Sequence, residues 1–292
     1  MKLSTQTHVL ANTYGHEECV RILAGAGYDA IDISLFEMEN GDGVWCTDEW
    51  RDHAKRLRAL AGEYGMTFNQ AHAPFPSTTG DGAKDEVIFE RILRSMQVSA
   101  ALGVRNIVVH PCHHIPYSLH KDELYRMNLN FYRRLIPYCE EYGIRACAEN
   151  MWQYDHKRNY IVDSVCSQPE EFCALLDELD SPWIVGCLDI GHCALVGVEP
   201  DRFIRAMGAK RIQALHVHDV SRVADSHTMP FMQKLDWEPI ACALGEIGYE
   251  GDLTFEADHF IAAFPNELKR DAAAMMVKVG RYLIGRVEAA RK

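Results

Sequence analysis

Short apolar runs alternate with helix-length segments along nearly the whole chain, and this alternation limits the folds open to it. The runs have the length and composition of strands, while segments such as 84–102 carry apolar residues at the three- and four-residue spacing of an amphipathic helix. The predicted strands are 3–9, 30–36, 66–73, 105–110, 144–149, 183–189, 211–218 and 252–257. Strands that alternate with helices in this way predict βα units and a parallel sheet.

The number of these units favours a closed barrel over an open sheet. A chain of 292 residues gives about 36 residues to each unit, as expected for a (β/α)8 TIM barrel. The stretch GAGYDA at 25–30 superficially matches a dinucleotide-binding fingerprint, but it follows a helix and precedes a strand, which is the wrong order for that motif. We therefore predict the α/β class, with a single-domain (β/α)8 TIM barrel over residues 1–292.

Charge and cysteine usage restrict the partners and the compartment. A formal net charge of −12 argues against nucleic acid, because phosphate binding requires a basic surface. The 10 cysteines include no C-x-x-C pair, which indicates reduced thiols. The amino terminus lacks the apolar core of a signal peptide, and no run is long enough to span a membrane. We expect a soluble, cytoplasmic protein that acts on a small polar substrate, with no membrane partner.

Ionisable residues stand at the ends of most predicted strands. Catalytic groups of TIM barrels lie at the carboxyl ends of the strands. The residues found there, in strand order, are His72, His110, Glu149, Asp189, His216 with His218, and Glu256. Each alone has an ordinary structural explanation, such as a helix cap for Asp189. Together they predict a functional site at one end of the barrel.

Three carboxylates at one barrel mouth would be costly to bury without a cation, because they repel one another and burial disfavours charge. Glu149, Asp189, His216 and Glu256 follow one another at intervals of about one βα unit, so they come from four successive strands. Such a set suits one divalent metal ion: Mn²⁺, Mg²⁺, Co²⁺ or Zn²⁺. Strand alternation turns the two histidines of LHVHDV to the same side and Asp219 toward the helices.

Four segments resemble the xylose isomerase-like TIM-barrel superfamily, which includes ketose 3-epimerases, hydroxypyruvate isomerases, inosose-processing enzymes and endonuclease IV. They are AENMWQYD at 148–155, LDIGH at 188–192, LHVHDVSR at 215–222, and LDWEPIACALGEIGYEGDLTFEAD at 235–258. The resemblance implies that Glu149, Asp189, His216 and Glu256 hold the metal. It further implies sugar contacts from Asp155, His192 and Arg222, where Asp155 replaces the glutamate usual in the epimerases.

The activity implied is a metal-dependent sugar or polyol isomerase or epimerase. A metal-stabilised enediolate would form, and Glu149 and Glu256 would act as general base and general acid. His72, His110 and His218 are expected to line the substrate pocket. Phe75, Trp45 and Trp152 could form an apolar wall for a sugar, although packing is the simpler explanation for each of them alone. An inosose-type dehydratase or isomerase uses the same apparatus and remains open. A homo-oligomer is possible.

Two alternatives come from other functional classes. A multi-zinc phosphodiesterase like endonuclease IV needs nine ligands, and residues of the right types are His72, His110, Glu149, Asp189, His192, His216, Asp225, His227 and Glu256. The acidic charge and the short interval between His216 and Asp225 oppose it. A sugar-binding barrel without catalysis is disfavoured because both candidate acid–base glutamates are present.

Overall fold

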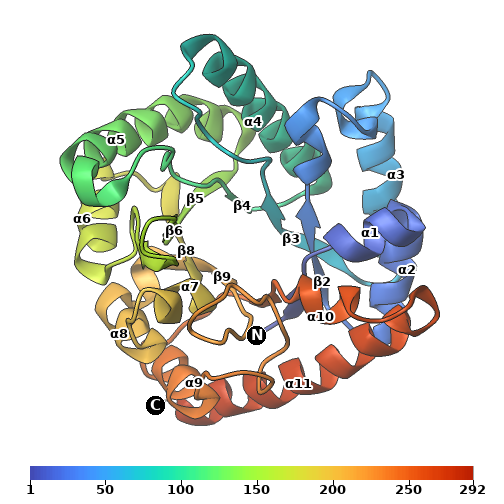
Figure 1. The fold of residues 1–292 in the computed structure, drawn as a ribbon. Helices are drawn as coiled ribbons and strands as arrows, with labels where there is room; N and C mark the ends of the chain where they lie inside the picture. The colour runs from blue at the N-terminus through green and yellow to red at the C-terminus, as the bar shows by residue number, and fades with distance from the viewer. Residues whose placement is uncertain (292) are drawn as a thin grey trace.

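The strands form a closed parallel barrel in the computed structural model, which describes residues 1–291 (Figure 1). The barrel strands are β1 (Leu3–Thr5), β2 (Ala30–Ser34), β3 (Thr67–His72), β4 (Asn106–Val108), β5 (Arg145–Glu149), β8 (Ile184–Asp189), β9 (Ile212–His216) and β10 (Leu253–Phe255). A six-stranded sheet runs in the order β2-β3-β4-β5-β8-β9, and β1 pairs with β10. Parallel bridges from Gln6 to Asp32 and from Val217 to Phe255 join the two sheets into a ring. The predicted (β/α)8 barrel is confirmed.

Helices surround the ring of strands, as the view along the barrel axis shows (Figure 1). They are α1 (His8–Tyr14), α2 (His16–Ala26), α3 (Trp50–Glu63), α4 (Gly82–Leu102), α5 (Tyr117–Tyr142), α6 (Pro169–Leu179), α7 (Ile190–Leu195), α8 (Pro200–Arg211), α9 (Trp237–Glu246), α10 (Asp258–Ala262) and α11 (Lys269–Ala290). Three 3₁₀ helices lie in loops: η1 (Phe36–Asn40), η2 (Val44–Cys46) and η3 (Asn266–Leu268). None of the helices within 1–291 is long and apolar enough to cross a membrane.

Side chains alternate between the inside and the outside of the barrel along each strand, and they form one apolar core inside the barrel and another between the strands and the helices. A small cluster of Val108, Cys147, Val185, Cys187 and Ala214 fills the inside of the barrel. The larger cluster includes outward-facing strand residues packed with the helices. Inward-pointing positions at the carboxyl ends of the strands are therefore free for polar side chains, above a packed apolar plug.

The expected strands all occur, although several are shorter than predicted. β4 ends at Val108, two residues before His110, and β9 ends at His216, so His218 lies in the following loop. Each of the 10 cysteines has a free thiol.

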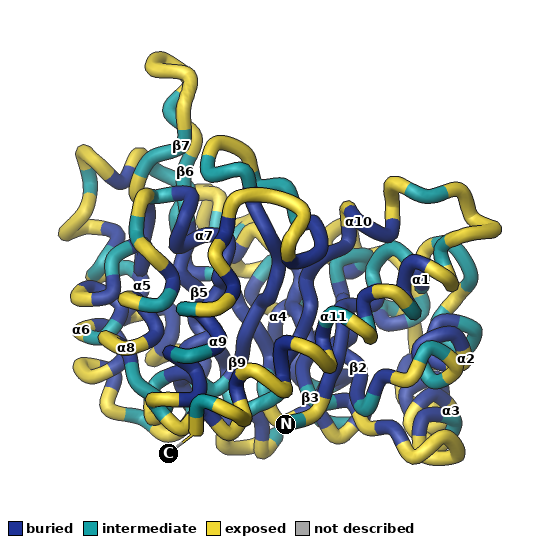
Figure 2. Tube along the Cα trace, turned by 90° about the horizontal axis from the view of Figure 1, so that it is seen from below, coloured by how far each residue is buried: buried dark blue, intermediate teal, exposed yellow. Residues whose placement is uncertain are grey.

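A hairpin of β6 (Trp152–Asp155) and β7 (Tyr160–Asp163) was not predicted from the sequence. It projects beyond the carboxyl ends of the barrel strands (Figure 2). Because it follows β5 directly, it places Trp152 and Gln153 beside the barrel mouth.

Candidate functional site

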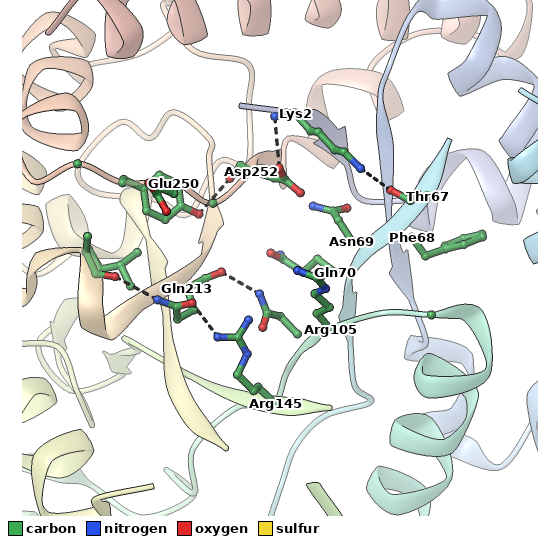
Figure 3. Close-up of a pocket in the computed structure, with 17 residues that line it drawn as sticks. Lys2, Thr67, Phe68, Asn69, Gln70, Arg105, Arg145, Gln213, Glu250 and Asp252 are labelled. Carbon is green, nitrogen blue, oxygen red and sulfur yellow. Dashed lines mark hydrogen bonds between the residues drawn. The ribbon is translucent and has the colours of Figure 1, made fainter. Parts of the chain in front are cut away.

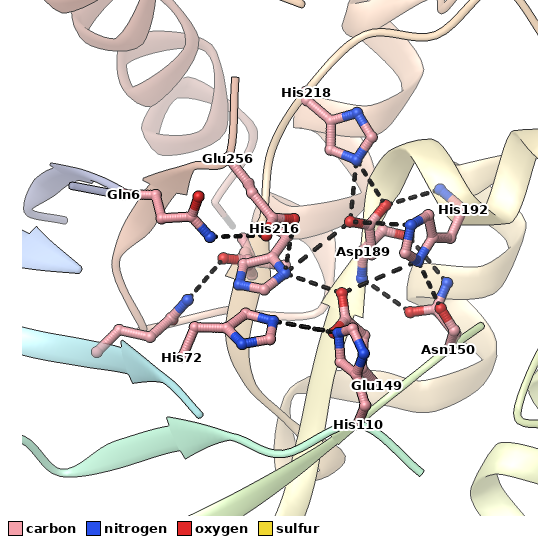
Figure 4. Close-up of polar contacts among 12 residues, drawn as sticks. Gln6, His72, His110, Glu149, Asn150, Asp189, His192, His216, His218 and Glu256 are labelled. Carbon is pink, nitrogen blue, oxygen red and sulfur yellow. Dashed lines mark hydrogen bonds and ion pairs between the residues drawn. The ribbon is translucent and has the colours of Figure 1, made fainter. Parts of the chain in front are cut away.

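Four side chains from successive strands converge at the carboxyl end of the barrel (Figure 4). The Nδ1 atom of His216 lies 2.8 Å from Glu149 Oε1, 3.0 Å from Glu256 Oε2 and 3.9 Å from Asp189 Oδ2. All four residues are buried, and one donor atom of each lies within 4.8 Å of those of the other three. The structure thus brings together the four predicted metal ligands around one point.

The chemistry of these donors fits a divalent cation. Three carboxylates at such close range repel one another, and one imidazole supplies at most one compensating charge. Burial alone would raise the pKa of Glu149, but His216 and His110 beside it hold that pKa well below its ordinary value. For Glu256, burial is likewise outweighed, chiefly by His216, and its pKa is also lowered. Oxygen-rich sets with one imidazole suit Mg²⁺, Mn²⁺ or Zn²⁺.

Two histidines support Glu149 from the side of β3 and β4. His110 Nε2 lies 3.0 Å from Glu149 Oε2, and His72 Nε2 lies 3.1 Å from His110 Nε2. Burial, with the neighbouring His110 next in effect, lowers the pKa of His72 to about 3. A neutral His72 can donate to or accept from its neighbours without adding charge to the site.

A further cluster lies on the other side of Asp189. Asp225 Oδ2 lies 3.3 Å from His192 Nε2 and 3.1 Å from His227 Nε2, and it accepts a hydrogen bond of 3.1 Å from the Trp152 indole. Burial opposes a charged imidazole at His227, but Asp225 outweighs it and raises the pKa of His227 to about 10. With His218, these ligand-type residues form a second group that could hold a cation.

His218 is not among the described residues that line the pocket. Its ring is fully buried and stacks on His227 with centroids 4.1 Å apart. Its Nε2 lies 3.0 and 2.9 Å from the two carboxylate oxygens of Asp189. His218 therefore orients Asp189 from behind, whereas the sequence predicted a pocket-lining position.

A pocket of about 760 Å³ opens above the four converging residues. Its wall includes the predicted His72, His110, Glu149, His192 and Glu256. Of the four candidate metal ligands, the two glutamates line this pocket, while the other two lie beneath them. A molecule in the pocket would therefore meet both glutamates directly.

Two predicted sugar contacts and one predicted wall residue lie elsewhere. Arg222 pairs with Glu199 through two hydrogen bonds of 2.8 Å, and Asp155 accepts from backbone N–H groups of the β6–β7 turn. Neither is part of the pocket wall among the described residues. Trp45 is fully buried beside His16 and His53, so it packs in the core and does not form the pocket wall.

Sequence reasoning missed several residues of the site. Gln6 donates a hydrogen bond of 2.8 Å to Glu256 Oε1, and His113 and Asp258 line the pocket. Asn150 receives the Asp189 N–H at 2.8 Å and donates to the Asp189 carbonyl at 2.9 Å, which ties the ends of β5 and β8 together. In the sequence, Asn150 directly follows Glu149 and Asp258 lies two residues after Glu256. This closeness to predicted ligands was the feature that could have identified both residues.

A second cavity, of about 630 Å³, lies at the opposite, amino-terminal end of the strands (Figure 3). Lys2, Arg105 and Arg145 share its wall with Glu250 and Asp252. It contains none of the predicted site residues. Because TIM-barrel chemistry occurs at the carboxyl ends of the strands, the pocket above Glu149 and Glu256 is the candidate active site.

Comparison with known sequences identifies one family and distant relatives. The family described as xylose isomerase-like TIM barrel matches residues 20–279. An uncharacterized protein of Sinorhizobium fredii is 25% identical over 57% of this chain and 51% of its own length. Another, from Methanocaldococcus jannaschii, is 26% identical over 63% of this chain and 62% of its own length. The match thus spans about half to three fifths of these curated relatives.

Solved structures match over almost the whole chain. A D-tagatose 3-epimerase-like protein superposes with a TM-score of 0.78 at 20% identity, covering 99% of both chains. A D-psicose 3-epimerase gives a TM-score of 0.73 at 16% identity, covering 98% of this chain and 100% of that one. The 3-keto-D-glucoside 4-epimerase of E. coli gives 0.73 at 18% identity, with 95% and 99% covered. At these identities the likeness establishes the fold.

Proposed function

Because the chain belongs to the xylose isomerase-like TIM barrel family, we propose that it is a divalent-metal-dependent sugar or polyol isomerase or epimerase. The observation that carries the proposal is the placement of Glu149 and Glu256. Both glutamates belong to the four-residue group that could hold a metal ion, and both line the pocket above that group. The names of the structural neighbours, which are sugar epimerases, support a carbohydrate substrate.

Glu149, Asp189, His216 and Glu256 would hold one Mn²⁺, Mg²⁺, Co²⁺ or Zn²⁺ ion. The ion would act as a Lewis acid that polarises the substrate carbonyl and favours loss of the neighbouring proton. One glutamate would remove that proton from the carbon next to the carbonyl and later release it to solvent. The other would take up a proton from solvent and deliver it to the substrate. Delivery to the opposite face of the same carbon gives epimerisation, and delivery to the neighbouring carbon gives isomerisation.

The surrounding side chains prepare the two glutamates for this role. Their lowered pKa values keep both carboxylates ionised and able to accept a proton. Gln6 fixes Glu256, and His110 fixes Glu149, at hydrogen-bonding distance. His192 lines the pocket and remains a proposed substrate contact. None of Asp155, Arg222 and His218 lines the described pocket, so their substrate contacts stay predictions from the sequence alone. The extent of the domain over residues 1–292 also stays a prediction.

The test combines metal content with proton exchange at the substrate carbon. Wild type is expected to hold one divalent ion per chain and to exchange the proton next to the carbonyl of a ketose or inosose with D₂O. Glu256→Gln should remain folded but lose this exchange by at least about 100-fold. The control is Glu63→Gln, an exposed site on α3, which should behave as wild type. Full exchange in Glu256→Gln would refute the mechanism.

A multi-zinc phosphodiesterase is the second candidate, and one observation favours it. The nine residues of its ligand set converge in three neighbouring groups: His72–His110–Glu149, the four-residue site, and His192–Asp225–His227 with His218. Two or three zinc ions per chain, together with cleavage of DNA at abasic sites, would support this candidate. One metal ion per chain and no DNA cleavage would leave the isomerase or epimerase. An inosose-type dehydratase would be distinguished from both candidates by a product that has lost one water molecule relative to the substrate.

A further inference from the structure

We propose that the cavity at the amino-terminal end of the barrel binds a small hydroxylated anion, that is, a sugar or polyol that carries a phosphate or a carboxylate. This cavity lies at the opposite end of the strands from the candidate active site, and the inference does not depend on the proposed function. Three features carry it: a polar space where barrels are ordinarily packed, two guanidinium groups without carboxylate partners, and buried amide oxygens without hydrogen-bond donors.

The amino-terminal end of this barrel is hollow. In TIM barrels, layers of bulky apolar side chains ordinarily fill the interior. Asn106 and Arg145 each stand two residues before a member of the inner apolar cluster, so strand alternation points both into the barrel below that cluster. They line a cavity of about 630 Å³, a volume within the range of small-molecule sites. The protein therefore keeps a ligand-sized space at this end, with polar groups on its wall.

Two arginines on neighbouring strands bring positive charge to the wall. The backbone N–H of Arg145 donates to the Arg105 carbonyl at 2.9 Å, so the two residues stand side by side where β4 and β5 begin. The guanidinium of Arg145 donates a hydrogen bond of 2.8 Å to Gln213, which is a neutral side chain. Among residues 1–291, neither arginine forms an ion pair. Because guanidinium groups bind phosphate and carboxylate through paired N–H donors, this part of the wall favours an anion.

The two carboxylates of the wall lie across the cavity from the arginines. Glu250 and Asp252 precede β10, and other strands separate β10 from β4 and β5 in both directions around the ring. Asp252 accepts a hydrogen bond of 3.3 Å from the Lys2 backbone N–H, and the Lys2 ammonium joins the wall on that same side. A cation therefore already stands beside the acidic side of the cavity, whereas no anion stands beside the two arginines.

Buried amide oxygens on the wall need donors. The Oδ1 atoms of Asn69 and Asn106 are buried and accept no hydrogen bond within the described chain. The Asn69 amide nitrogen donates to the Ser4 hydroxyl at 3.1 Å, and the Asn106 nitrogen donates to the Gln213 carbonyl at 2.8 Å. A buried acceptor without a partner costs free energy, which a donor in the cavity would recover. Hydroxyl groups are such donors, so the site suits an anion that also carries hydroxyls.

The groups surround one open space (Figure 3). Arg105 and Arg145 lie on one side of it, and Asp252 lies on the other. A ligand whose anionic group contacts the two guanidinium groups would extend its hydroxyls toward the amide oxygens and Asp252, all of which accept hydrogen bonds. The wall thus provides for both kinds of group on one small molecule.

Calorimetry on the metal-loaded full chain tests the site. The probes are D-glucose 6-phosphate and D-gluconate, with D-glucose and inorganic phosphate for comparison. At least one of the two hydroxylated anions should bind at least about tenfold tighter than both comparison compounds, because only these ligands satisfy the arginines and the amide oxygens together. Whichever of the two binds tighter supports the site and identifies its anionic group.

Variants then locate the binding. Arg145→Gln should weaken binding of the hydroxylated anion by at least about tenfold, and Arg105→Gln by at least about threefold. Arg105 is exposed, so Arg105→Gln should fold as wild type and decides the matter if circular dichroism finds Arg145→Gln unfolded. The matched control is Arg126→Gln, which removes an exposed guanidinium on α5 and should leave binding unchanged.

Three results would overturn the inference. The first is that none of the four compounds binds, which would leave the cavity to water. The second is that D-glucose or inorganic phosphate binds as tightly as the hydroxylated anions. The third is that binding survives both Arg145→Gln and Arg105→Gln, which would place the ligand elsewhere, such as on the metal ion. The proposed function is unaffected by all three, because proton exchange at the substrate carbon tests it separately.

Discussion

Asp219 offers a sharp test of how the loop over the site is held in place. It is fully buried on the helix-facing side of the chain after β9, as strand alternation predicts. Its Oδ1 accepts from the backbone N–H groups of Val220 at 2.9 Å and Leu235 at 3.1 Å. Its Oδ2 accepts from the Gln233 N–H at 3.0 Å and the Trp237 indole at 3.2 Å. One carboxylate thus closes the loop that carries Asp225 and His227.

The magnitude follows from these bonds. Hydrogen bonds to a charged group contribute about 1.5–3 kcal/mol each, and a buried donor left without a partner costs about 1–3 kcal/mol. Asp219→Ala removes all four acceptor contacts, so we expect a loss of at least about 4 kcal/mol after partial relaxation, a large effect for one substitution. Asp219→Asn keeps one oxygen and its two donors, and should cost roughly half as much.

Urea unfolding, with the slope checked to be unchanged, measures the free energy of unfolding. Asp236→Ala is the control, since Asp236 belongs to the same loop but caps α9 with one exposed hydrogen bond of 3.2 Å to the Glu238 N–H. Loss of such a cap costs about 1 kcal/mol. If Asp219→Ala costs no more than Asp236→Ala, the carboxylate does not hold the loop, and the reasoning fails.

Three further predictions concern metal, packing and pH. Adding the divalent ion at about 100 times its Kd should stabilise the metal-free chain by about 2.7 kcal/mol. The measurement is the Tm, which should rise on adding the ion and fall again on adding EDTA. An unchanged Tm would contradict the metal site. A Cβ at Gly191 would lie 2.2 Å from the buried ring of His218, so Gly191→Ala should lower the free energy of unfolding in urea by about 1–3 kcal/mol. Gly62→Ala, where a Cβ on α3 would meet open space, should instead raise it by about 0.5–1 kcal/mol. Burial, and after it the neighbouring His53, lowers the pKa of His16 to about 4, whereas the pKa of an unfolded histidine is about 6.5. Between these two pH values the unfolded chain binds more protons than the folded chain. The free energy of unfolding should therefore fall as the pH drops from 6.5 to 4. His16→Gln should flatten this dependence by up to about 1.4 kcal/mol per pH unit in urea unfolding, and an unchanged slope would contradict the assignment.

Much of the site followed from local rules that the sequence obeys on its own. Two-residue alternation and the carboxyl ends of parallel strands were enough to group Glu149, Asp189, His216 and Glu256, because every strand of a barrel delivers its last inward residue to the same rim. The same alternation turned Asp219 toward the helices, where the structure places it. The chain therefore encodes its fold and the four-residue cluster in patterns that need no knowledge of distant contacts.

Loop conformation and the substrate wall were decided only by the tertiary structure. Arg222 pairs with Glu199 at the start of α8 and lies outside the pocket wall, and His218 is held behind Asp189 by contacts with Asp189 and His227. Each of these outcomes depends on a partner in a different segment of the chain, and residue spacing does not specify which partner a loop side chain will meet. Strand geometry is repetitive and local, whereas loop geometry is set by long-range hydrogen bonds and packing.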